Sequence, residues 1–172
     1  MKHYITDEDI NRVSIKNLPY HDDNTCEGIE AYCKYLLSAS KEYNNSNECG
    51  LVLDSFDFTK FNIFKGTDTN VKLTIDFNQY LQRYPDEHAN RYIFIHNHPN
   101  CRGFSIRDFK SFINNDALYL LIALQNDGLA HILIKSELLI VKPELKVTMT
   151  HKEVINYLKD FGILYFRRYS NV

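Results

Sequence analysis

The stretch that decides the fold is RYIFIHNHPNCRGFSIRDFKSF, from Arg91 to Phe112. It begins with the run Tyr92 to Ile95, whose β-branched and aromatic residues predict a buried strand. The strand is expected to stop at Pro99, because proline has no amide hydrogen to give to a ladder. After a short loop that contains Gly103, an apolar stripe at helical spacing predicts a helix.

The polar residues of this stretch predict a metal site. Side chains alternate along a strand, so His96 and His98 point to one side and Asn97 to the other. Ser105 is a favourable N-cap, and Asp108 then falls in the first helical turn, where the helix dipole favours a carboxylate. Two imidazoles and one carboxylate give a tetrahedral zinc ion three protein ligands and leave one position for water, as in catalytic sites.

His-x-His-Pro followed by Ser-x-x-Asp resembles the metal motif of the JAB1/MPN/Mov34 metalloenzyme (JAMM) family. With Asn between the two histidines, the motif most resembles that of the RadC-like and prokaryotic JAB-domain branch. The resemblance covers roughly residues 48–137 and implies an α/β (α+β) fold. This would be a single JAB/MPN-like (cytidine-deaminase-like) domain with a mixed β-sheet flanked by helices. One departure is the loop between His98 and Ser105, which has six residues where the common pattern has seven.

The resemblance also implies a role for each residue of the motif. His96, His98 and Asp108 would bind one zinc ion per chain, and Ser105 would stabilise the oxyanion. Histidine and carboxylate ligands also suit iron, cobalt or nickel.

The family pattern places a general base upstream, just before a glycine and an apolar strand. Glu48, followed by Cys49 and Gly50, fits that pattern, while Glu42 and Asp54 are alternatives. With this base the resemblance implies a zinc-dependent metallohydrolase that cleaves a peptide or isopeptide bond through a metal-activated water. Its substrate would be a protein or peptide, with a ubiquitin-like protein to be deconjugated or processed as one case.

The alternative hypothesis is a RadC-like, non-catalytic scaffold or a nucleic-acid-associated module. Relatives that have become scaffolds typically lose metal ligands, and here none is missing, which favours catalysis. A net charge of −2 argues against a large nucleic-acid footprint, which requires a basic face. Arg102, Arg107 and Lys110 are therefore interpreted as part of a solvated helix face.

Composition predicts one soluble globular domain. The chain has 172 residues, of which 44% are hydrophobic and 24% charged. We expect no membrane span and no export signal, hence a cytoplasmic protein. The four cysteines have no disulfide or zinc spacing and are expected to be free thiols. Packing accounts for Cys49, whereas Cys101 has no assigned role and the oligomeric state is open.

The remaining elements are predicted from periodicity and turn residues. Residues 1–25 are expected to form a mostly irregular arm with one short strand, followed by the domain at 26–172. Helices are expected at Glu27 to Tyr43, capped by Thr25, at Asp76 to Tyr84, and at His151 to Arg168, the last for packing or a dimer contact. Strands are expected at Cys49 to Leu53, Lys60 to Lys65, Val71 to Thr74, Leu118 to Leu124, Ala130 to Ile134 and Leu138 to Val141. His131 is expected to be a strand residue and not a ligand, and His88 is expected to be exposed.

Overall fold

The computed structural model describes residues 1–69, 89–137, 139, 141–146 and 148–168. Its centre is a six-stranded mixed sheet in the order β2-β1-β3-β4-β5-β6. The strands are β1 (Cys49–Asp54), β2 (Asp57–Lys65), β3 (Tyr92–His98), β4 (Leu118–Gln125), β5 (Ala130–Lys135) and β6 (Ile163–Arg168). The helices are α1 (Asp7–Asn11), α2 (Asp23–Tyr43), α5 (Ile106–Asn114) and α6 (His151–Lys159). The predicted mixed sheet flanked by helices is therefore confirmed.

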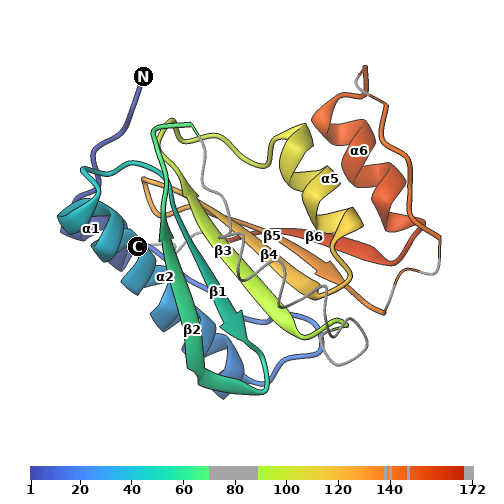
Figure 1. The fold of residues 1–172 in the computed structure, drawn as a ribbon, viewed down its shortest axis with the longest axis horizontal. Coiled ribbons are helices and arrows are strands. Elements are labelled where there is room, and N and C mark those ends of the chain that lie inside the picture. Colours follow the sequence, from blue (N-terminus) through green and yellow to red (C-terminus); the bar gives the residue numbers. More distant parts are fainter. Residues whose placement is uncertain (70–88, 138, 140, 147, 169–172) are drawn as a thin grey trace.

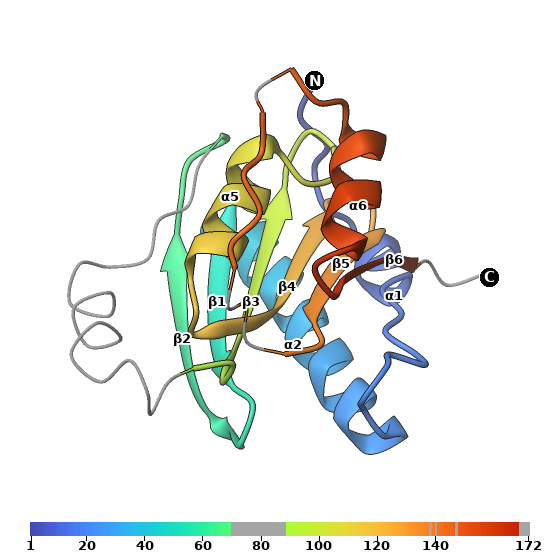
Figure 2. The same cartoon turned by 90° about the vertical axis from the view of Figure 1, so that its right-hand side faces the viewer.

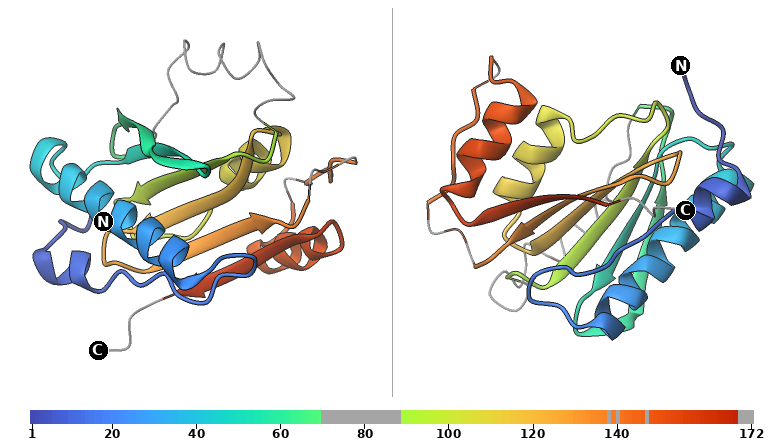
Figure 3. Two further views of the ribbon diagram at one scale, coloured as in Figure 1. Left: turned by 90° about the horizontal axis from the view of Figure 1, so that it is seen from below. Right: turned by 180° about the vertical axis from the view of Figure 1, so that it is seen from behind.

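The helices form two layers, one on each side of the sheet (Figures 1 and 2). The long helix α2 and the short helix α1 lie on one face, and α5 and α6 lie on the other. Seen from below and from behind, the sheet separates the two helical layers over most of its width (Figure 3).

Strands β3 and β4 form the parallel pair of the sheet, and α5 connects them. The other neighbouring strands are antiparallel. A parallel pair needs a crossover on one face, so the sequence between His98 and Leu118 has to lie over the sheet. This crossover brings the first turn of α5 back to the end of β3.

Each face of the sheet has its own apolar core, because side chains alternate along the strands. Under α2, the core contains Leu51, Ile93 and Ile95 with the inner side of α2. Under α5 and α6 it contains Phe109, Phe112, Leu121, Leu133 and Leu158. The even-numbered residues of β3, His96 and His98 among them, lie on the α5/α6 face.

The N-terminal arm differs from its prediction in one respect. It is mostly irregular, but its regular element is the helix α1 and not a short strand; Thr6 and Asp9 form a capping box there. Ile15 and Leu18 of the arm are buried in the core under α2. The N-cap of α2 is Asp22 and not Thr25, so the proposed boundary after residue 25 falls inside this helix.

The C-terminal helix predicted for His151 to Arg168 is wrong beyond Lys159. The chain leaves α6 through Gly162, which has φ +72°, and continues as the edge strand β6. Only glycine adopts this left-handed conformation without strain, and it commonly ends helices. Residues Ile163–Lys135 and Arg168–Ala130 pair across β6 and β5, so the segment completes the sheet.

Several predictions concern other parts of the chain. The strand expected at Val71 to Thr74, the helix at Asp76 to Tyr84 and His88 lie outside the described residues. In the segment Leu138 to Val141, the described Leu139 and Val141 are not in a strand.

All four cysteines are free, and Cys49 is buried as expected. No helix in the described ranges has the length and apolar character needed to cross a bilayer.

Candidate metal centre

The end of β3 places two imidazoles side by side at the edge of a cleft. The Nε2 atoms of His96 and His98 lie 2.9 Å apart. His96 is buried between β1 and β4, with 1% of its surface exposed. Gly50 pairs with His96 across β1, and Ala123 pairs with it across β4, so neither neighbouring strand places a large side chain beside the ring.

The hydrogen bonds of the two rings limit their tautomers. Nδ1 of His98 lies 2.8 Å from the carbonyl oxygen of Arg102, which can only accept, so Nδ1 carries the hydrogen. When this ring is neutral, the lone pair of its Nε2 faces the site, as in metal-binding histidines whose orientation a second partner fixes. Nδ1 of His96 is buried and has no hydrogen-bond partner among the described residues.

Asp108 approaches both imidazoles from the first turn of α5. Its Oδ1 lies 3.6 Å from Nε2 of His96, and its Oδ2 lies 3.6 Å from Nε2 of His98. Ligand atoms around a tetrahedral zinc ion are about 3.4 Å apart, given zinc–ligand distances near 2.1 Å. The spacing of the three side chains is therefore close to that of a zinc triad.

Ser105 holds the Asp108 carboxylate in place. The two residues form a capping box, in which Oδ2 of Asp108 accepts the Ser105 amide hydrogen at 2.6 Å and the hydroxyl hydrogen at 2.7 Å. The predicted N-cap is thus confirmed. A hydroxyl has one hydrogen to donate, so in this arrangement the hydrogen of Ser105 is given to Asp108.

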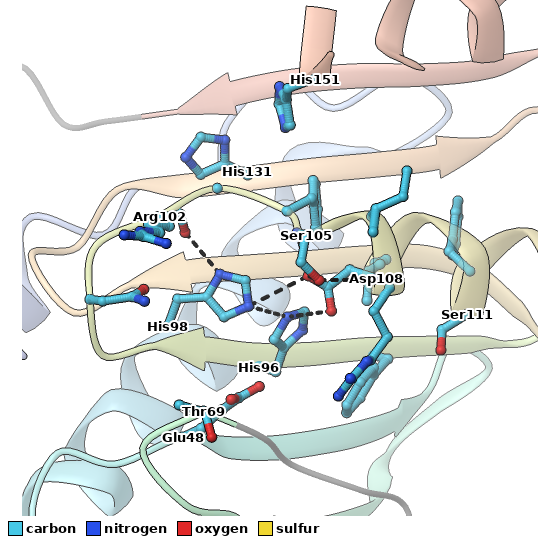
Figure 4. A pocket seen from close by; sticks show the side chains of 18 of the residues that line it. Glu48, Thr69, His96, His98, Arg102, Ser105, Asp108, Ser111, His131 and His151 are labelled. Carbon is cyan, nitrogen blue, oxygen red and sulfur yellow. Dashed lines mark hydrogen bonds and ion pairs between the residues drawn. The ribbon is translucent and has the colours of Figure 1, made fainter. Parts of the chain in front are cut away.

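Glu48 supplies a second carboxylate, from the side opposite Asp108 (Figure 4). It immediately precedes β1, and extending the pairing of Gly50 with His96 places it across from His98. A carboxylate oxygen of Glu48 and one nitrogen of each imidazole all lie within 4.8 Å of one another. This range allows Glu48 either to bind a metal directly or to reach a metal-bound water. The competing candidate Asp54 instead pairs with Arg91 at 2.7 Å, at the other end of β1.

The electrostatics of this group fit a cation. Burial, which outweighs the attraction of Asp108, lowers the pKa of His96 to about 4, so the ring is neutral near pH 7. Burial alone raises the pKa of Asp108, but His96 and the hydrogen bonds from Ser105 outweigh it and keep the carboxyl ionised. The carboxylates of Glu48 and Asp108 then lie beside the neutral imidazole of His96 in a largely buried place, which favours the binding of a cation.

The four side chains lie in a cleft of about 990 Å³ over the α5/α6 face of the sheet. Its far wall is formed by residues that the sequence did not indicate as functional, His131, His151, Tyr165 and Arg167. His131 is indeed a strand residue, but its ring faces the cleft (Figure 4). No local motif marks these residues, because they come from β5, α6 and β6, which only the tertiary fold brings beside β3.

His131 is held in one orientation by neighbours on both sides. Nε2 of His131 accepts a hydrogen bond from the Gln125 amide at 2.9 Å, so Nδ1 carries the hydrogen and donates it to the Tyr165 hydroxyl at 2.7 Å. Burial and then the positive charge of Arg167 lower the pKa of His131 to about 4. The ring is therefore a neutral, fixed part of the cleft wall.

Comparison with known proteins gives no independent assignment, since no protein-family model and no curated protein matches this chain. The geometry itself brings together four of the predicted site residues, Glu48, His96, His98 and Asp108, and places Ser105 beside Asp108.

Proposed function

We propose that this protein is a metal-dependent amide hydrolase of the JAMM type that cleaves a peptide or isopeptide bond. His96, His98 and Asp108 would hold one zinc ion in the cleft. The bound zinc would lower the pKa of a water ligand to about 7 and polarise the substrate carbonyl.

The residues of the chain then have separate tasks. Glu48 takes the proton of the attacking water and later gives it to the leaving amine, which is general acid–base catalysis by one carboxylate. Ser105 donates a hydrogen bond to the developing oxyanion, for which its hydroxyl must turn away from Asp108. The capping box fixes Oδ2 of Asp108 at the helix terminus, so that Oδ1 remains directed at His96.

The single observation that carries this proposal is the meeting of two carboxylates and two imidazoles from separate elements at the edge of one cleft. A structural zinc site would close all four positions with ligands. Here the His96, His98 and Asp108 group borders a cleft that can admit a substrate, and Glu48 lies on the other side of the imidazoles.

The test is a search for amide hydrolysis with the zinc-loaded protein and a library of cellular peptides, followed by mass spectrometry. We expect new termini with the wild type and a loss of about 100- to 10,000-fold in rate with Glu48→Gln, which keeps its zinc. Glu42→Gln, at an alternative base near the end of α2, is the matched control and should retain full activity. Stoichiometric zinc with no cleavage of any peptide would favour the RadC-like scaffold instead.

A further inference from the structure

The cleft contains an unusual set of arginines. Six arginines lie in the described ranges, and three of them, Arg102, Arg107 and Arg167, line the cleft. They come from the β3–α5 loop, the first turn of α5 and β6, so the fold brings together charges that are far apart in the sequence. The sequence interpretation of Arg102 and Arg107 as a simple solvated face did not include Arg167.

The other three arginines of the described ranges are all engaged. Arg12 forms an ion pair with Glu8, and Arg91 holds Asp54 with two nitrogens. Arg168 donates to the carbonyl oxygens of Lys16 and Asn17.

The three cleft arginines differ from this pattern. Among the residues that the structure describes, none of their guanidinium groups forms an ion pair or a hydrogen bond. Guanidinium groups bind carboxylates in a planar, two-pronged geometry, so these three are available for an external anion.

The row of residues across the sheet shows how these charges relate to the metal centre. His96 pairs with Ala123, Ala123 with His131, and His131 with Arg167, so all four lie on one face in one line. Arg167 is three strand spacings from His96, or about 14 Å. Ala123 is fully buried, and the ring of Phe104 packs near both His96 and His131 over this row.

From this arrangement we infer that the cleft recognises an acidic peptide segment next to the scissile amide. Arg102 and Arg107 flank the metal centre itself. The distance of about 14 Å from His96 to Arg167 corresponds to about four residues of an extended peptide, since each residue spans about 3.3 Å. The inference rests on the proposed function for the position of the scissile bond, but not for the recognition of the anion.

A peptide fits this cleft better than a nucleic acid does. Nucleic-acid binding needs many cations along an extended face, whereas the whole chain has a net charge of −2. The wall between the arginines is formed by the rings of Phe104, His131 and Tyr165, which pack around one another, whereas the carboxylates of the cleft, those of Glu48, Asp68 and Asp108, come from other parts of its lining.

The recognition can be tested without catalysis. Binding of a fluorescein-labelled oligoglutamate to the full chain would be measured by anisotropy, with oligoglutamine of equal length and oligothymidylate as competitors, with and without zinc. We expect oligoglutamate to bind in both states and oligoglutamine not to compete. Each exchange of a cleft arginine for glutamine should weaken binding by about two- to fivefold, and the triple variant by at least about tenfold.

Two matched controls separate the cleft from the general surface. Arg168→Gln changes the next residue of β6, and Lys110→Gln changes an exposed cation of α5 outside the cleft. Both should bind oligoglutamate like the wild type. Equal loss in the controls and the triple variant, or tighter and more salt-dependent binding of oligothymidylate, would overturn the inference.

The outcomes also separate this inference from the proposed function. Arginine-dependent binding of oligoglutamate with no hydrolysis would leave the inference standing and remove the hydrolase. Peptide cleavage that shows no preference for Asp or Glu within about four residues of the cut, and that is unchanged in Arg167→Gln, would support the hydrolase and overturn this inference.

Discussion

The two faces of β3 use polar side chains in opposite ways. On the α2 face, Asn97 has no exposed surface, and both polar atoms of its side chain have hydrogen-bond partners. Its Oδ1 accepts the amide hydrogen of Cys49 at 2.7 Å, and its Nδ2 lies 2.6 Å from Oδ1 of Asn126 and 3.2 Å from the Asn47 carbonyl. Asn126 in turn donates to the carbonyl oxygens of His3 and Ser46.

On the other face, the neighbours His96 and His98 meet each other and two carboxylates. Here one buried nitrogen, Nδ1 of His96, has no partner in the described part of the chain, and the carboxylates of Glu48 and Asp108 lie close to the imidazoles. A closed network such as that of Asn97 stabilises the fold, whereas an open group of this kind is suited to bind something from outside. The comparison thus gives Asn97 a structural role and leaves the histidine face as the site of the proposed metal ion.

The largest effect that separates the two faces should be stabilisation by zinc. At a zinc concentration about 1,000 times its Kd, the ion should raise the free energy of unfolding of the wild type by about 4 kcal/mol. His96→Ala/His98→Ala should lose this increase, because both imidazole ligands are gone. Asn97→Ala should keep it, from a lower starting stability. Thermal unfolding with and without zinc checks the prediction, and an equal zinc effect in all three proteins would break the comparison.

The next effect concerns stability without zinc. Asn97→Ala should lower the free energy of unfolding by about 3 kcal/mol, because the Cys49 amide and the Asn126 side chain lose their buried partner. His98→Ala changes the next residue of β3, on the opposite face of the sheet, and should change the free energy of unfolding by less than about 1 kcal/mol, since its removal relieves the close contact with the His96 ring. Urea unfolding of the metal-free proteins measures both. A larger loss for His98→Ala would mean that its ring supports the fold.

A smaller loss of stability than that of Asn97→Ala should come from changes at Ser105. As an N-cap, its change to Ala should cost about 1 kcal/mol and its change to Gly only about 0.3 kcal/mol. If its hydroxyl also serves the oxyanion, both variants should keep zinc and lose about 100-fold in turnover. Ser111→Ala, which removes another hydroxyl from the same cleft and helix, is the control. Loss of zinc in both Ser105 variants would show that the serine acts only by positioning Asp108.

The strand β3 and the helix α5 were predicted well from the sequence because their signals are local. Pro99 marks the strand end, Ser105 and Asp108 mark the helix start, and alternation places the two histidines on one face. Glu48 lies far from this stretch in the sequence, and only the pairing of β1 with β3 brings it to the imidazoles.

The wrong or missing predictions concern segments whose structure depends on tertiary contacts. Leu164 and Tyr165 continue the apolar spacing of α6, so periodicity extended the helix through a glycine that ends it. The far wall of the cleft could not be predicted, because His131 and Arg167 become neighbours only when β6 pairs with β5. In the arm, the buried Ile15 and Leu18 have no periodic pattern, and their burial depends on the surface that α2 leaves uncovered.

The most direct test of the metal centre is the metal content of the purified protein by elemental analysis. The wild type, His96→Ala/His98→Ala and His151→Ala would be compared after the same exposure to zinc; His151 lines the same cleft but lies outside the ligand group. We predict about one zinc ion per chain in the wild type and in His151→Ala, and none in the double variant. A wild type that binds no metal, or a double variant that binds as much as the wild type, would contradict the assignment.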